Sequence, residues 1–481
     1  MIYLFIVLYL AGLFAISVLT SKKNMSVDDF LLGGRSMGPW ISAFAYGTTY
    51  FSAVIFVGYA GSVGYKNGIA GVLCGLGNGI IGSLMPWLIL AKPTRNFTGK
   101  YGISTMPGFF EKRYDSKGLK VAGAIIIFVF LMPYCASVYQ GLSYLFEVSL
   151  GIKFEYCMLA MAFITALYLF FGGYFTTAFV NLFQGVVMLV GVFLMVVFIM
   201  YNPRIGGFVN GIRQLKEMDP KLVSFRLNDI SSVITMVMLT SLGSWGLPQM
   251  VHKFYTIKDE KAIKTGMIIS TVFALLIASS AYFLGAFGRF FMDAPAAAGA
   301  AVDTSTIVPV MITRALPEIL IGLVVALVLS ASMSTLSSLV LVSASSIAVD
   351  LLKGHFKKDM SEKSVVMVLR ILCVVFVGVS LLIALDKNNA IVTLMSYSWG
   401  TISGCFIAPF TYGLYWKGMT KAGAFSGIIC GLAVNLLGFF FIKNAALAGV
   451  ISMLASLVIV PIVSLCTKKY SDEFNKDIMD F

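Results

Sequence analysis

Apolar stretches of about twenty residues recur along the whole chain and alternate with short polar segments. An α-helix needs about 20 apolar residues to cross about 30 Å of hydrocarbon. The pattern therefore predicts an all-α polytopic membrane protein, in which the first stretch is a retained helix rather than a cleaved leader. Thirteen spans are expected, at residues 2–20, 38–63, 69–91, 121–146, 154–172, 178–200, 230–252, 265–288, 319–349, 364–385, 390–414, 423–441 and 446–466.

Two of these spans contain residues that interrupt a helix. The second, ISAFAYGTTYFSAVIFVGYAGSVGY, has Gly47 before two threonines near its middle, and the seventh, MLTSLGSWGLPQMVHKF, has Gly243, Gly246 and Pro248. Proline cannot donate a backbone hydrogen bond and clashes with the preceding turn. Interrupted backbone at membrane depth persists where it lines a cavity or is buried in protein. We expect both spans to be broken helices, and a tolerated kink is the alternative for each.

The two interrupted spans occupy corresponding places in two sets of five. One opens residues 38–201 (spans two to six), and the other opens residues 230–414 (spans seven to eleven). Interrupted helices at matching positions of two inverted halves indicate the binding site of a secondary transporter. The pattern predicts one transporter domain, residues 1–481, with an inverted-repeat core and three peripheral spans, at residues 2–20, 423–441 and 446–466.

The ninth span is unusually rich in hydroxyl groups. Nine of the seventeen residues from Ser330 to Ser346 are serine or threonine. Small hydroxyl residues let membrane helices pack closely and hydrogen-bond to one another. Neutral oxygens can also replace the hydration shell of a monovalent cation such as sodium. Residues three and four apart share a helix face, and this places together Ala331, Ser334, Thr335 and Ser338, with Ser337 beside them.

Composition and charge support a membrane protein and exclude a nucleic-acid partner. Hydrophobic residues make up 59% of the 481 and charged residues 12%, about half the charged share of a soluble protein. The net charge of +13 comes from lysines and arginines that gather on one side of the predicted topology, above all in residues 92–120 and in the tail. This positive-inside bias predicts an outside amino terminus, an outside loop Asn202–Asp229 and a cytoplasmic carboxyl terminus.

Several features that resemble chemical motifs favour structural roles. GNGIIG, from Gly77 to Gly82, lies within one apolar span, so close helix packing fits better than a dinucleotide loop. The seven cysteines form no C-x-x-C pair, and His252 and His355 are isolated at span ends. We therefore expect no enzyme activity and no organic cofactor.

The acidic residues bear on the coupling ion. None of the 22 falls in the middle third of a predicted span, and Glu147, Asp350 and Asp386 lie at span ends. Proton relays across membranes usually employ buried carboxylates or histidines. The sequence therefore favours sodium over the proton as the coupling ion.

The motifs together resemble the sodium:solute symporter family, in particular its proline and pantothenate carriers. The resemblance spans nearly the whole chain. It is carried by DDFLLGGRSMGPW from Asp28, FVGYAGSVGY from Phe56, YCAS from Tyr134, FGGYFTTAFVNLFQG from Phe171, WGLPQMVHKFYTIKD from Trp245 and SASMSTLSSLVLVSASSIAVDLL from Ser330.

The resemblance implies a LeuT-like core of five plus five helices and a sodium site between spans two and nine. The ligands it implies are the backbone carbonyls of Thr48, Phe51 and Ala331 and the hydroxyls of Ser334 and Thr335. Some relatives hold a second sodium with an acidic residue where this chain has Asn181, together with serines matching Ser337 and Ser338. Asn181 carries no charge, so a second site here would be weak and we expect one sodium per substrate.

The same resemblance places the substrate beside the two breaks. Where proline carriers have an acidic residue, this chain has Tyr50. An amino acid such as proline, or a small carboxylate such as pantothenate, is the expected class, because helix amino termini favour anions and no buried lysine or arginine is expected to compete. The aromatic candidates could instead belong to an interfacial belt or the packed core. The candidate contacts are Tyr50, Ser52, Ser244, Trp245, Gln249, Tyr397 and Trp399.

The sequence thus predicts a sodium-coupled symporter that imports a small polar solute by alternating access. We expect an integral protein of a bacterial cell membrane, surrounded by lipid. Three alternatives stay open: a proton-coupled or uncoupled carrier of the same fold, a transporter-like membrane sensor, and a membrane enzyme. Only about fifteen residues follow the last predicted span, which disfavours the sensor. The missing catalytic groups disfavour the enzyme.

Overall fold

The computed structural model describes residues 2–20, 26–293, 303–357, 359–386 and 391–481. Its regular elements in these ranges are helices, and a single isolated bridge joins Met37 to Ile257. The longer helices are α1 (Ile2–Thr20), α3 (Pro39–Tyr50), α8 (Lys117–Leu150), α9 (Phe154–Met200), α10 (Phe208–Met218), α11 (Leu227–Val237), α13 (Glu260–Phe287), α16 (Glu318–Ser345), α17 (Glu362–Ala384), α18 (Ile391–Tyr415), α19 (Lys421–Phe441) and α20 (Ala445–Cys466). Shorter ones are α2 (Val27–Leu32), α4 (Tyr65–Asn67), α5 (Val72–Gly79), α6 (Lys92–Lys100), α7 (Met106–Tyr114), α12 (Pro248–Tyr255), α15 (Ile307–Ala315) and α21 (Asp472–Met479).

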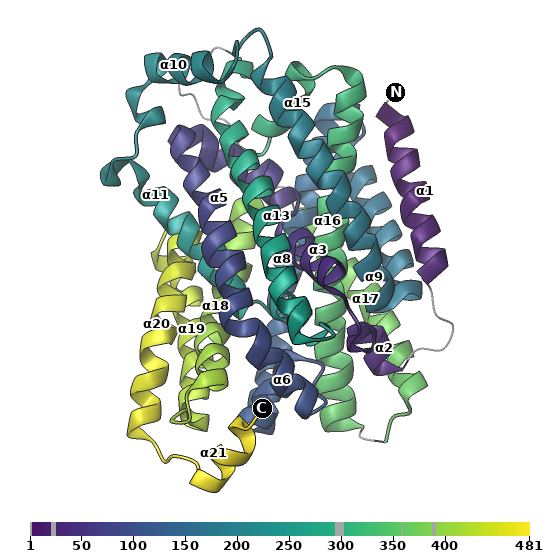
Figure 1. Cartoon of the computed structure of the whole chain (residues 1–481), viewed down its shortest axis with the longest axis vertical. Coiled ribbons are helices and arrows are strands. Elements are labelled where there is room, and N and C mark those ends of the chain that lie inside the picture. Colours follow the sequence, from purple (N-terminus) through teal and green to yellow (C-terminus); the bar gives the residue numbers. More distant parts are fainter. Residues whose placement is uncertain (1, 21–25, 294–302, 358, 387–390) are drawn as a thin grey trace.

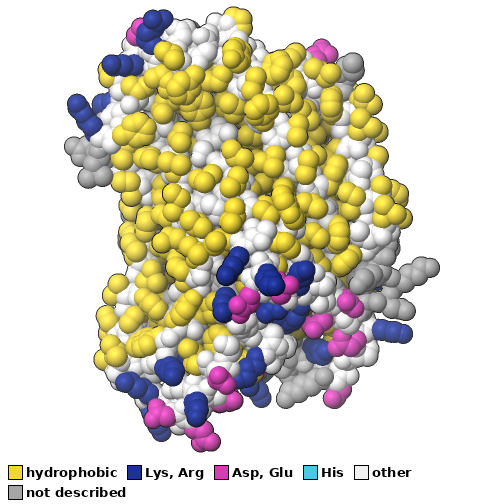
Figure 2. Space-filling view, viewed as in Figure 1, with side chains coloured by type: hydrophobic (Ala, Val, Ile, Leu, Met, Phe, Trp, Pro, Cys, Tyr) yellow, Lys and Arg dark blue, Asp and Glu magenta, His cyan; other side chains and the backbone are white. Residues whose placement is uncertain are grey.

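Most of the long helices run along one common axis (Figure 1). The start of α1 lies at the same end of the molecule as α10 and α15, and α6, α21 and the carboxyl terminus lie at the other end. Figure 2 shows a broad band of hydrophobic side chains between these ends, with charged side chains gathered beyond it. This is the surface of a protein embedded in a bilayer.

The expected number of thirteen spans is not reproduced by helix length and composition. Ten helices of the described ranges are long and apolar enough to cross a membrane, or eleven if one bent pair counts as a span. Residues 154–172 were expected to be a separate span, but this first part of α9 has an apolar helix of only Phe154–Leu167, which is shorter than a membrane span, whereas Gly172–Met200 is long enough. Residues 38–63 divide at their break, and the second part runs into a helical stretch Val54–Lys100.

The turn inside α9 depends on one glycine. Gly173 has φ 60° and ψ −172° within an otherwise helical run from Phe154 to Met200. A side chain would be strained in that conformation, which glycine adopts freely. Gly173 therefore separates two helices within the range of α9, and the expected spans 154–172 and 178–200 lie on its two sides.

The break in the second span lies four residues later than expected. Gly47 is helical and lies against Phe273, whose ring is 2.5 Å from where a Cβ would sit. Helix α3 continues to Tyr50, and the chain is extended at Phe51 (φ −109°, ψ 109°). The chain becomes helical again as the π-helix η2 (Val54–Gly64). Gly47 therefore serves close packing, and the unwound backbone is at Phe51 and Ser52.

The break in the seventh span is confirmed. A short 3-10 helix, η8 (Gly243–Gly246), ends at the extended residue Leu247, and α12 begins at Pro248. The two parts of the span meet at 45°. Proline is well placed here, because the first residue of a helix has no intrahelical acceptor for its N–H.

Helix α16 is the central helix of the protein. Every residue from Val324 to Ser345 is buried, and the helix packs against α1, α3, α8, α9 and α17. Its serines are therefore enclosed on all sides, and all of their hydroxyls except that of Ser343 bond to backbone carbonyls, which offsets the cost of burying a polar group.

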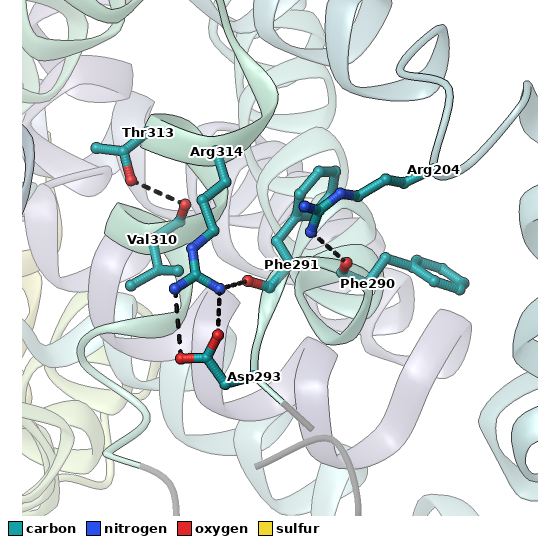
Figure 3. Close-up of polar contacts among 7 residues, drawn as sticks. All are labelled: Arg204, Phe290, Phe291, Asp293, Val310, Thr313 and Arg314. Atoms are coloured by element: carbon teal, nitrogen blue, oxygen red, sulfur yellow. Dashed lines mark hydrogen bonds and ion pairs between the residues drawn. The ribbon is translucent and has the colours of Figure 1, made fainter. Parts of the chain in front are cut away.

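Hydrogen bonds and an ion pair join several segments at the end of the molecule that carries α10 (Figure 3). Arg314 of α15 binds both carboxylate oxygens of Asp293, at 2.8 and 3.3 Å, and donates to the Phe291 carbonyl. Arg204 donates to the Phe290 carbonyl at 3.2 Å. The Arg314 guanidinium holds the pKa of Asp293 below its ordinary value. These bonds tie α15 and the loop after α9 to the segment that follows α13.

Candidate functional site

Two hydroxyls of α16 meet the carboxyl end of α3. Ser334 Oγ donates to the Thr48 carbonyl at 2.9 Å and lies 3.0 Å from the Ala331 carbonyl. Thr335 Oγ1 lies 3.0 Å from the Ala331 carbonyl, 3.1 Å from the Thr49 carbonyl and 3.4 Å from the Thr48 carbonyl. Two hydroxyls and three carbonyls thus converge in a fully buried contact.

The break after α3 explains why the Thr48 and Thr49 carbonyls can bond to α16. Carbonyls in the last turn of a helix have no intrahelical donor, and α3 ends at Tyr50. Phe51, the fifth predicted sodium ligand, caps this end and is fully buried. The structure therefore brings Thr48, Ala331, Ser334 and Thr335 together and places Phe51 one turn beyond Thr48.

Two of the three residues expected for a weak second sodium site, Ser337 and Ser338, lie beside this contact. Ser337 and Ser338 both bond to the Ser334 carbonyl, at 2.9 and 3.1 Å. Asn181 of α9 is fully buried, and neither polar atom of its amide has a partner among the described residues.

The expectation that no buried lysine lies near the site is wrong. Lys253 of α12 is 2% exposed, and its Nζ donates to Ser338 Oγ at 2.8 Å. The residue was expected just outside the seventh span, in the cytoplasmic loop. The bend at Leu247 redirects α12, so all eight of its residues are buried.

Tyr50 is held at the centre of the expected substrate region. Its hydroxyl donates to the Thr240 carbonyl at 2.7 Å and accepts from the Asn78 amide at 3.0 Å. Its ring stacks on Trp399 with 6.1 Å between centroids. Tyr134 makes a T-shaped contact with Trp399, with 5.7 Å between centroids.

Two polar groups beside Tyr50 and one on α12 have unused hydrogen-bonding capacity. The Tyr134 hydroxyl, the Trp399 indole N–H and the Gln249 amide oxygen are buried without a partner in the described part of the chain. Native proteins leave few buried polar groups unbonded, so these three groups can bond to a ligand that enters this region. A stacked aromatic wall with unused donors and acceptors suits a small solute that has both apolar and polar parts.

The other substrate candidates differ in what they can offer. Ser244 Oγ donates to the Gly82 carbonyl at 3.0 Å, and Ser52 Oγ accepts from the Val54 backbone N–H at 3.2 Å. The Trp245 indole donates to the Ile81 carbonyl at 2.8 Å. Ser244 and Trp245 therefore bond the second break to the carbonyls of residues 81 and 82, and Ser52 bonds to the backbone that follows the first break.

Tyr397 lies on a different face of α18 from Trp399. Its ring packs against Phe439 of α19 at 4.8 Å. Residues two apart point to nearly opposite sides of a helix, so the two aromatic residues cannot line one site together. Tyr397 belongs to the contact with the peripheral helix α19.

Sequence reasoning missed Asn78 and Tyr134. Asn78 belongs to GNGIIG, where the glycine packing is confirmed: side-chain atoms of Val237 and Leu275 lie 2.6 and 2.3 Å from where a Cβ of Gly77 and of Gly79 would sit. Asn78 also lies within about 3 Å of Tyr50, Thr240 and Ser241. An amide within an apolar span was the available signal for Asn78, and the YCAS motif was the signal for Tyr134.

Comparison with solved structures identifies the fold. The fold matches that of a Na+-coupled sialic acid symporter in its substrate-bound, outward-open state, with a TM-score of 0.79, 18% identity, and 98% of this chain and 99% of the other covered. It also matches a nucleobase-cation-symport-1 family transporter in a closed conformation, with a TM-score of 0.54, 15% identity and 93% and 98% coverage. The predicted all-α, LeuT-like fold class is confirmed.

Residues 30–431 match the sodium:solute symporter family, and the chain belongs to this family. Relatives include the sodium/proline symporter of Staphylococcus aureus, which is 29% identical over 97% of this chain and 93% of its own length. The corresponding protein of strain JH9 of that species is also 29% identical. The protein is therefore a sodium-coupled solute symporter of the membrane and not an enzyme, as predicted.

Proposed function

We propose that sodium binds between α3 and α16, at the carbonyls of Thr48, Phe51 and Ala331 and the hydroxyls of Ser334 and Thr335. The observation that carries this is the convergence of both hydroxyls on the Thr48 carbonyl, within 3.4 Å. When sodium enters, each hydroxyl can turn its proton away and present a lone pair to the ion. Hard cations are held by sets of oxygens of this kind.

The position of this contact supports a mechanism of coupling. Thr48 precedes the unwound Phe51 and Ser52, and Tyr50 of the same turn stacks on Trp399. An ion that fixes the end of α3 therefore also fixes one wall of the proposed substrate region. Each ligand then raises the affinity for the other by the same factor, which is the thermodynamic requirement of symport.

We propose an amino acid such as proline, or a small carboxylate such as pantothenate, as the imported substrate. Tyr50, Trp399 and Gln249, with Tyr134, would form its site, and Ser52, Ser244 and Trp245 would hold the surrounding backbone. Helix α12 begins beside this region at Pro248, and the amino-terminal end of a helix favours an anionic group. The name of the Staphylococcus aureus relatives supports the amino acid.

Thermal unfolding of the purified protein tests this substrate class. A ligand that binds only the folded state raises the midpoint of unfolding by mass action. We expect one amino acid or small carboxylate to stabilise the protein in sodium and to have little effect in potassium. An equal shift in both salts would favour an uncoupled carrier, and a shift that follows pH instead of sodium would favour a proton-coupled one.

We propose residues 38–201 and 230–414 as two inverted repeats, with cytoplasmic residues 92–120 and tail and an outside loop Asn202–Asp229. A cysteine replacing Lys100 in a cysteine-free background should resist a membrane-impermeant maleimide in intact bacteria. A cysteine replacing Lys216, an exposed residue of α10, should react. The reverse pattern would invert the proposed orientation.

A further inference from the structure

The interior of the protein contains a lysine that has no acidic partner among the described residues. Lys253 is buried, and its Nζ contacts Ser338 Oγ at 2.8 Å and lies 5.1 Å from the centroid of the Tyr174 ring. Within the described ranges, no carboxylate lies within 4.0 Å of this ammonium. A hydroxyl oxygen and an aromatic face both attract a cation, so the surroundings are those of a cation site.

The hydroxyl that receives Lys253 belongs to the oxygen cluster of α3 and α16. Ser338 Oγ lies 2.9 Å from Thr49 Oγ1 and 3.1 Å from the Ser334 carbonyl. Ser334 is itself one of the proposed sodium ligands. The lysine ammonium is therefore separated from the proposed sodium site by a single residue of α16.

Asn181 lies on the face of α9 that runs past this cluster. Tyr174, Ala178, Asn181 and Gly185 follow one another at spacings of four, three and four residues, so they share a helix face. Tyr174 at one end contacts Lys253, and Gly185 at the other lies against Thr48, whose Cγ2 is 3.1 Å from where a Cβ would sit. Asn181 lies between these contacts, buried, with both amide atoms unbonded to described residues.

We propose that the Lys253 ammonium is a built-in cation that takes the place of a second sodium ion, and that Lys253 with the neutral Asn181 fixes the stoichiometry at one sodium per substrate. The inference rests on the proposed sodium site between α3 and α16. Two positive charges a few ångströms apart in a low-dielectric interior repel strongly. A sodium ion at Ser337 and Ser338 would meet that repulsion with no carboxylate to offset it. Lys253 is thus a specificity-determining residue for the number of ions carried.

The variant Lys253→Met/Asn181→Asp tests this proposal. Methionine keeps most of the length of the lysine stem without its charge, and aspartate supplies a negative oxygen ligand. In proteoliposomes, we expect the charge moved per neutral substrate to rise from about one to about two, with a matching rise in the Hill coefficient for sodium. Lys253→Arg retains the cation and should stay at about one. Lys258→Met is the matched control, since Lys258 is exposed and lies 3.7 Å from Asp259.

Two results would overturn the proposal. One is a double variant that still carries a single charge per neutral substrate. The other needs no variant: equilibrium binding of radioactive sodium to the wild-type protein at a ratio of two ions per chain, where we expect one. A Ser334→Ala protein measured in parallel separates the two levels of inference. Unchanged sodium affinity in Ser334→Ala refutes the proposed sodium site itself. If Ser334→Ala lowers sodium affinity but the double variant still moves one charge per substrate, only the role of Lys253 is refuted.

Discussion

Ser334→Ala and Thr335→Ala are each expected to raise the sodium concentration for half-maximal uptake about tenfold or more. A cation that has left water must regain its hydration from fixed oxygens, and each substitution removes one of them. The loss corresponds to about 1–3 kcal/mol for one unmade polar contact. Alanine keeps the helix intact. Sodium activation of substrate uptake in proteoliposomes measures the effect.

Ser343→Ala is the matched control for these two variants. Ser343 is buried in the same helix, and its hydroxyl has no partner among the described residues. We expect its loss to leave sodium activation unchanged. If α16 hydroxyls serve only packing, Ser334→Ala and Thr335→Ala will lower thermal stability and keep the wild-type sodium dependence. That outcome would remove sodium from this position.

Trp399→Phe is expected to raise the KM for the transported substrate roughly tenfold, because it removes an unused buried N–H donor and part of the ring that stacks on Tyr50. Phenylalanine retains most of the buried apolar area, so the protein should still fold. Uptake at saturating sodium gives the value.

Tyr397→Phe offers a comparison two residues away in α18. Tyr397 faces Phe439 of α19, so its variant should transport with the wild-type KM. Equal values for both variants, with sodium dependence preserved, would show that the substrate does not contact the aromatic wall at Trp399.

The helices and the second break could be predicted because their signals are local. Apolar length defines a span, and Pro248 after two glycines interrupts one wherever it lies. The first break could not be located as well. Gly47 is compatible with an unwound chain and with close packing, and only the position of Phe273 on α13 shows which use applies.

The same distinction explains what was found and missed in the site. Ser334 and Thr335 share a face with Ala331 by helix periodicity, so their convergence could be predicted within one helix. Lys253 could not be placed, since its depth depends on the 45° bend before α12. The groups that surround Tyr50 come from Asn78, Tyr134 and Thr240, which are brought together only by tertiary packing.

The absence of a formal charge in the Ser334–Thr335 contact affects the return half of the transport cycle. Both hydroxyls have backbone carbonyls as acceptors, so after sodium departs each one can bond within the protein. A carboxylate in their place would be left as an uncompensated charge in an apolar interior, at a large cost. This contact therefore adds no buried charge of its own when the unloaded carrier reorients. Sodium adds one positive charge here in the loaded state, on which the membrane potential acts with about 2.3 kcal/mol per charge for each 100 mV.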